Sequence, residues 1–103
     1  MGSLLKGNPM VWTFVQISDG VEAYAGQTDE EEKIAFLPIF IDKENAEACM
    51  PSMPRAPGVT LEAQAVRYRE ISADAARNGF LLFVLDGEGR ILDKLAPVDR
   101  PLS

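Results

Sequence analysis

The sequence predicts an α+β fold, a mixed α/β sandwich in which one mixed sheet of about five or six strands packs with two short helices. Apolar and β-branched runs of strand length recur along the chain, and Gly, Pro, Asp or Asn bounds them. Two segments between these runs instead have helix caps. Hydrophobic residues make up 47% and charged residues 25% of 103 residues, which is a globular composition. The predicted order is β-β-β-α-β-α-β-β.

The first predicted element is a β-hairpin. Val11 to Ile17 is β-branched and aromatic, which favours a strand. The dipeptide Asp19-Gly20 tolerates the positive φ angles of a tight turn. Val21 to Ala25 alternates in polarity and is the expected return strand.

An acidic segment follows the hairpin. Gln27 to Lys33 contains four adjacent carboxylates, Asp29 to Glu32, whose repulsion predicts a solvated loop. A cation site or a contact for a basic partner is the alternative. It is disfavoured because consecutive side chains of an extended segment point to opposite sides and converge poorly on one ion.

The segment Ile34 to Ile41 is almost continuously apolar and predicts a strand covered on both faces. Pro38 lacks a backbone donor, which indicates an edge position or a strand end. Asp42 is placed to cap a helix of about two turns, which Pro51 would end. Pro51 to Gly58, with three prolines, predicts a restricted loop.

The stretch Val59 to Glu70 fits both helical and strand spacing. Ser72 and Gly79 have the character of an N-cap and a C-terminal glycine, which predicts a short helix between them. A helix that begins at Ser72 leaves a strand as the favoured state of Ala63 to Arg69, while a helical state of Val59 to Glu70 stays open.

The C-terminal third predicts a second hairpin. Phe80 to Leu85 is the most apolar run and is expected to be a central strand. Asp86-Gly87-Glu88-Gly89 forms the turn, and Ile91 to Leu95 is the return strand. The sequence thus predicts one domain over residues 10–96, with flexible tails over residues 1–9 and 97–103.

Composition excludes several classes of function. The net charge is −6 and no basic cluster occurs, so nucleic-acid binding is not expected. No run of about 18 apolar residues predicts a membrane span, and a single cysteine with no visible signal peptide predicts a cytoplasmic bacterial protein. Histidine is absent, which removes histidine-based catalysis and metal binding.

No residue pattern predicts an enzyme, a cofactor or a metal. Cys49 falls near the end of its predicted helix, where the dipole disfavours a thiolate, so core packing is expected. The chain has 16 acidic residues, but their spacing selects no acid–base pair.

The remaining candidate is an interaction surface. Arg67, Tyr68 and Arg69 form the compact basic-aromatic spot of the sequence, and Arg67 and Arg69 would share one strand face and hold an anionic group. Pro38 and Phe40 belong to the strand expected at the sheet edge, where self-association through Leu37 to Ile41 is plausible.

The sequence therefore predicts a non-catalytic protein-interaction or regulatory module with a protein partner or self-association. The alternative is a small-molecule or peptide sensor with a pocket near Pro51 to Gly58 and Arg67/Arg69.

The segment from Leu37 to Ala46, Leu-Pro-Ile-Phe-Ile-Asp-Lys-Glu-Asn-Ala, is similar to one in SseB-like (enhanced serine sensitivity) N-terminal domains and related small bacterial domains of unknown function. The later order also resembles that family: a strand, a helix with Ala75-Ala76, and Gly79-Phe80 leading into an apolar strand. The chain departs from the family at its last turn, Asp86 to Gly89, where an Asn-Pro is frequent. The resemblance implies a small α/β domain and no established catalytic residue.

Overall fold

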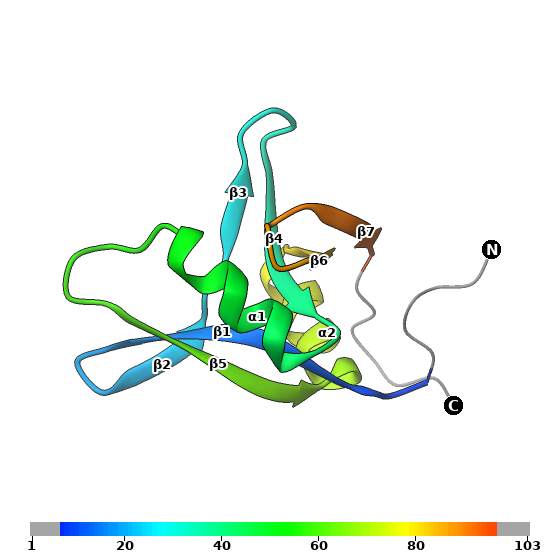
Figure 1. The fold of residues 1–103 in the computed structure, drawn as a ribbon. Coiled ribbons are helices and arrows are strands. Elements are labelled where there is room, and N and C mark those ends of the chain that lie inside the picture. Colours follow the sequence, from blue (N-terminus) through cyan, green and yellow to red (C-terminus); the bar gives the residue numbers. More distant parts are fainter. Residues whose placement is uncertain (1–6, 97–103) are drawn as a thin grey trace.

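The computed structural model describes residues 7–96, which form one mixed sheet of seven strands with two α-helices (Figure 1). The predicted fold class is confirmed, although the sheet has seven strands rather than five or six. The elements in chain order are β1 (Met10–Ser18), β2 (Val21–Tyr24), β3 (Gln27–Asp29), β4 (Ile34–Phe40), α1 (Lys43–Cys49), the 3-10 helix η1 (Met50–Ser52), β5 (Thr60–Arg67), α2 (Tyr68–Asn78), β6 (Leu81–Leu85) and β7 (Ile91–Leu95).

The sheet is organised around β1 and β4. Along one edge, β1 pairs antiparallel with β5 from Met10↔Arg67 to Ile17↔Thr60. Its other edge pairs first with β4 and then, from Val15, with β2. β4 pairs in parallel with β6, which pairs antiparallel with β7.

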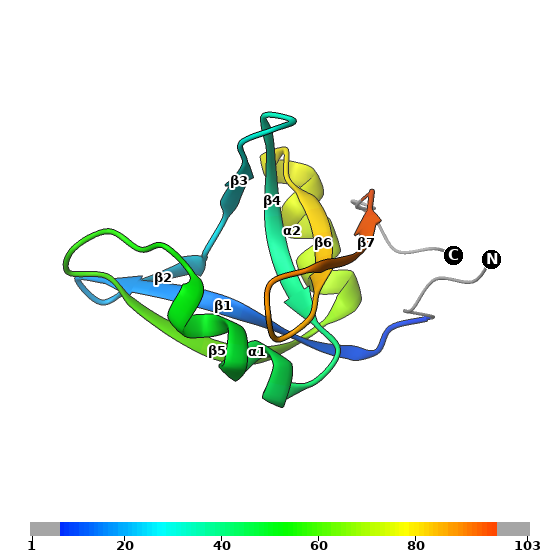
Figure 2. The same ribbon diagram turned by 45° about the horizontal axis from the view of Figure 1, so that its top comes forward.

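The chain between β2 and β3 bends the sheet. β2 pairs with the second half of β1, whereas β3 pairs with the beginning of β4. The segment therefore leaves one strand and joins the other, and Figures 1 and 2 show the β1–β2–β5 part crossing the β3–β4–β6 part steeply. β3 itself corrects the prediction for Gln27 to Lys33, because only the residues after Asp29 form a loop. Pairing with β4 supplies the backbone partners that decide this.

The two helices lie on opposite faces of the sheet (Figure 2). α2 packs through Ile71 and Ala75 against a cluster that includes Leu37 and Ile39 of β4. α1 packs on the other face, against a cluster that includes Phe40. Side chains of β4 thus alternate between two covered faces, as its continuous apolar sequence predicts.

The predicted edge position of Leu37 to Ile41 is wrong. β4 lies between β1 and β6, and Pro38 and Phe40 are buried in the core. Pro38 is opposite Phe83 in the parallel pairing with β6, but its carbonyl points to the β1 edge, where Thr13 bonds to it. Its nitrogen lies on that same edge, between the residues of β4 that pair with β3 and those that pair with β1, so no ladder bond needs its missing N–H. Pro38 and Phe40 therefore offer no exposed interaction surface, and pairing through this strand is excluded.

The stretch Val59 to Glu70 contains both predicted states. It is a strand to Arg67 and a helix from Tyr68. Ser72 is buried inside α2 and does not cap it, so the predicted helix start is wrong. The predicted end is confirmed, since Gly79 adopts a φ of 79° and its N–H bonds to the carbonyl of Ala75.

Several local predictions are confirmed. Asp19 and Gly20 have φ angles of 53° and 77° in the first hairpin turn. Asp42 caps α1 by accepting a 2.8 Å hydrogen bond from the Asn45 N–H. Asp86 holds the second turn by accepting from the N–H groups of Glu88 and Arg90.

Of the predicted tails, residues 1–6 and 97–103 lie outside the described residues. Asn8 and Pro9, which were predicted to belong to the first tail, are bound to the start of α2. The Pro9 carbonyl accepts a 2.8 Å bond from the Tyr68 N–H, and the Asn8 side chain accepts a 2.9 Å bond from the Arg69 N–H. These bonds satisfy the first free donors of α2 and explain why it begins before Ser72.

Candidate functional site

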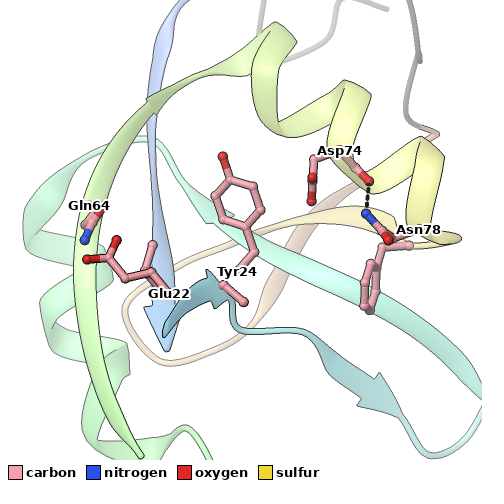
Figure 3. Close-up of a pocket in the computed structure, with 8 residues that line it drawn as sticks. Glu22, Tyr24, Gln64, Asp74 and Asn78 are labelled. Carbon is pink, nitrogen blue, oxygen red and sulfur yellow. Dashed lines mark hydrogen bonds between the residues drawn. The ribbon is translucent and has the colours of Figure 1, made fainter. Parts of the chain in front are cut away.

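A cavity of about 530 Å³ lies between α2 and the β1–β2–β5 part of the sheet (Figure 3). We call it the α2-face cavity. Its apolar wall is formed by Val15, Ala23 and Phe80. Its polar lining consists of Glu22, Tyr24, Gln64, Asp74 and Asn78.

Strand register and helix periodicity bring these side chains together. Val15 pairs with Tyr24 on β2 and Ile17 pairs with Glu22, so Tyr24 and Glu22 lie on the same face as Val15. Gln64 reaches this face from β5, where it pairs with Thr13. Asp74 and Asn78 are four residues apart on α2 and therefore share one side of the helix.

Figure 3 shows the ring of Tyr24 standing between Glu22 and Gln64 on one side and Asp74 and Asn78 on the other. Burial, and then the charges of Asp74 and Glu70, raise the pKa of Tyr24 above its usual value of 10.0. The phenol is therefore neutral at physiological pH and can donate or accept a hydrogen bond.

The cavity has an acidic character. Two carboxylates, Glu22 and Asp74, line it, and none of the described lining residues is basic. Asp74 has an exposed partner in Arg77, with Nη2 of Arg77 3.5 Å from Oδ1. Such a surface pair is weak, of the order of 0–1 kcal/mol, and a better-placed cation can displace it.

The two amides are partly engaged. Nδ2 of Asn78 donates to the backbone carbonyl of Asp74 at 2.8 Å, and Nε2 of Gln64 donates to Glu62 at 3.0 Å. These bonds occupy amide donors and leave the amide oxygens as acceptors for a ligand. Carboxylates, amide oxygens and aromatic faces together suit a ligand that brings positive charge and N–H donors.

The predicted basic-aromatic spot lies elsewhere. Arg67 ends β5, whereas Tyr68 and Arg69 belong to the first turn of α2, so Arg67 and Arg69 do not share a strand face. Tyr68 packs against the buried cluster under α2 that includes Leu37 and Ile39. Burial, followed by the charge of Asp93, raises the pKa of Tyr68. Nη1 of Arg67 donates to the Asn8 carbonyl at 3.3 Å.

The loop from Pro51 to Gly58 contributes to two other cavities, one on the α1 face and one beside β1. The lining of these cavities does not include Arg67 or Arg69. The predicted loop pocket and the two arginines are therefore separate features of the structure.

Cys49 is buried on the α1 face, as predicted, and its Sγ lies 3.9 Å from Sδ of Met53. Burial, and then the charge of Asp86, raise the pKa of its thiol. A protonated, enclosed thiol is a poor nucleophile and a poor metal ligand.

Within residues 7–96, no three His, Cys, Asp or Glu side chains gather in a metal-binding arrangement. No helix in this part of the chain is long and apolar enough to cross a bilayer.

Sequence reasoning did not single out any residue of the α2-face cavity. The spacing of Asp74 and Asn78 was a usable signal, since it places both on one helix side. No local sequence pattern connects them with Glu22 or Tyr24, because these side chains meet only through the register of three strands.

No protein-family model matches this chain, and comparisons with curated proteins and with solved structures find no significant match.

Proposed function

We propose that this chain is a non-catalytic regulatory module that recognises a protein partner by receiving one of its basic side chains in the α2-face cavity. The observation that carries the proposal is that Glu22 of β2 and Asp74 of α2 line one concave site, on either side of the Tyr24 ring (Figure 3), and that none of its described lining residues is basic. A cation entering the site would meet opposite charge from two directions.

The apolar wall adds selectivity for a long basic side chain. The aliphatic stem of Lys or Arg would pack against Val15 and Phe80, while its charged end approaches the carboxylates. The rings of Tyr24 and Phe80 offer cation–π contacts, each of about 0.5–2 kcal/mol. Arg matches the planar acceptors of Glu22, Asp74 and Asn78 better than Lys, because its donors form a rigid fork.

The alternative function is a sensor of a small-molecule amine. The volume of about 530 Å³ favours it, since small-molecule sites commonly measure about 300–1,000 Å³. The resemblance to SseB-like domains and a cytoplasmic location are part of the same proposal on either alternative.

The test is a titration of the protein with short peptides, followed by calorimetry and by backbone NMR shifts. One peptide carries a central Arg, a second carries a central Lys, and a third carries citrulline in place of Arg. We expect the Arg peptide to bind most tightly and the citrulline peptide to bind at least about tenfold more weakly. Shifts should concentrate at Tyr24 and along the exposed side of α2.

Variants of the carboxylates locate the site. Asp74→Asn and Glu22→Gln should each weaken binding of the Arg peptide about tenfold and reduce its salt dependence. Asp19→Asn, in the exposed hairpin turn, removes the same charge outside the cavity and should leave binding unchanged. Equal binding of citrulline, or equal loss with Asp19→Asn, would overturn the proposal. Saturable binding of free arginine amide with the affinity of the peptide would favour the sensor.

A further inference from the structure

A second cavity, of about 500 Å³, lies on the opposite face of the sheet. We call it the α1-face cavity. Phe36 of β4, Phe83 of β6 and Ile91 of β7 form part of its floor. Met53 and Pro54, from the segment after α1, form one wall.

The brevity of α1 explains why this part of the face is open. The helix has seven residues and gives way to η1, which begins with Met50 and Pro51. It packs through Ala46 and Cys49 into the buried cluster of this face, but it does not cover Ile91 of β7, which is partly exposed.

The floor of the α1-face cavity is built on an ordered aromatic pair. The rings of Phe36 and Phe83 stack with centroids 4.3 Å apart and an interplanar angle of 14°. Ile91 is 44% exposed at the margin of the cavity. Phe83 is itself fully buried, with Nζ of Lys94 5.2 Å from its ring centroid, so the accessible apolar groups are the half-buried ring of Phe36 and the side chain of Ile91. An aromatic ring beside an exposed aliphatic side chain is a favourable surface for burial of another apolar side chain.

The margin of the α1-face cavity that lies across from Ile91 is acidic. Asp29, Glu30 and Glu31, at the end of β3 and in the loop that follows, line it. Among residues 7–96, Lys94 pairs with the neighbouring Glu32 at 3.3 Å, whereas the three lining carboxylates have no ion-pair partner. The Asp29 carboxylate also accepts the N–H of Glu31 at 3.0 Å, which orders this turn.

The apolar side and the acidic side of the cavity together indicate what kind of ligand it would bind. We propose that the α1-face cavity docks a short partner segment in which an apolar side chain of Leu or Met size is followed by basic residues. The apolar side chain would pack against Phe36 and Ile91, and the basic residues would face Asp29, Glu30 and Glu31. Charge complementarity between an acidic margin and the segment selects this occupant over a purely apolar one.

This site is independent of the α2-face cavity, because the sheet separates them and no residue lines both. A partner could therefore use either site alone. The proposal concerns a second interaction surface and stands whether or not a basic side chain enters the first.

The test uses three synthetic peptides followed by NMR: acetyl-Gly-Leu-Lys-Lys-Gly-amide, the same peptide with Glu-Glu in place of Lys-Lys, and the same peptide with Gly in place of Leu. We expect the first to bind at least about tenfold more tightly than either of the others. Its shifts should include Ile91, Met53 and Glu30.

Two variants on one strand provide a matched pair. Ile91→Lys places a charge in the cavity and should weaken binding about tenfold or more. Leu92→Lys makes a comparable change at the adjacent residue, which is 53% exposed and does not line the cavity, and should have no effect. The double variant Glu30→Gln/Glu31→Gln should weaken binding and reduce its salt dependence. Asp74→Asn should change nothing, which separates this site from the α2-face cavity.

Several results would overturn the proposal. Equal affinity for the Glu-Glu peptide would remove the charge argument. Weakening by Leu92→Lys as large as by Ile91→Lys would place binding elsewhere. A concentration-dependent dimer in sedimentation equilibrium that Ile91→Lys alone abolishes would assign the cavity to a second copy of this chain.

Discussion

The hydroxyl of Thr13 donates a 2.7 Å hydrogen bond to the backbone carbonyl of Pro38, and both residues are buried. The bond joins β1 to β4 at the point where β4 passes from β3 to β1. The Thr13 hydroxyl thus gives the Pro38 carbonyl a hydrogen-bond donor at a position where no backbone N–H of the ladder provides one. A proline-containing strand can therefore lie at the centre of the sheet.

We expect Thr13→Val to lower the free energy of unfolding by about 1–3 kcal/mol, because it leaves the buried Pro38 carbonyl without its donor. Urea denaturation with an unchanged m-value checks this. Thr13→Ser keeps the hydroxyl and should retain more stability than Thr13→Val. If serine and valine cost the same, the hydrogen bond is not what stabilises this position.

We expect Asn8→Ala to destabilise the protein by about 0.5–2 kcal/mol, the usual cost of removing a helix cap. The Asn8 side chain is remote in sequence, but it accepts from the Arg69 N–H in the first turn of α2. Asn8→Asp keeps an acceptor and should be tolerated. Faster amide exchange of Arg69 in Asn8→Ala locates the effect, and an unchanged rate would contradict the capping role.

We expect Gly26→Ala to destabilise the protein by about 1–3 kcal/mol through overpacking. A Cβ at Gly26 would lie 2.6 Å from Cε1 and 2.8 Å from Cζ of Phe80, so the ring would have to move. Because Phe80 lines the α2-face cavity, peptide binding there should also weaken. Phe80→Leu should recover part of the loss in the double variant. Additive losses of the two single changes would exclude this contact as the cause.

We expect Asp86→Asn to show a pH-dependent loss of stability. The N–H of Arg90, and further N–H groups and charge in the turn, hold the pKa of Asp86 below its usual 3.8 in the folded protein. The unfolded chain therefore binds a proton at a higher pH than the folded chain.

The stabilisation by the Asp86 charge is full above pH 3.8 and is lost as the pH falls through the lower folded pKa. The difference in unfolding free energy between the wild type and Asp86→Asn should thus be largest near neutral pH and should shrink in acid. Denaturation curves from pH 2.5 to 7 measure it. A difference that grows toward low pH would have the wrong sign.

The fold class could be predicted from the sequence because its signals are local. The Asp19-Gly20 turn, the Asp42 cap and the Gly79 helix end each depend on residues within one turn of the chain, and each is confirmed. The prediction for Ser72 failed because the competing cap, Asn8, is distant in the sequence. The edge position predicted from Pro38 was wrong for the same reason, since its hydrogen-bond partner Thr13 lies on another strand.

The candidate site could not be predicted from local sequence. β2 and β5 bring Glu22, Tyr24 and Gln64 together only by pairing with β1, and α2 adds Asp74 and Asn78 only by packing on the same face of the sheet. The sequence by itself determined the acidic balance, the absence of histidine and the alternation of apolar and polar segments. These properties follow from composition and short-range periodicity. Only the tertiary structure decided which carboxylates share a cavity and which apolar side chains stay uncovered. Both depend on strand register and on where a short helix ends, which are settled by long-range packing.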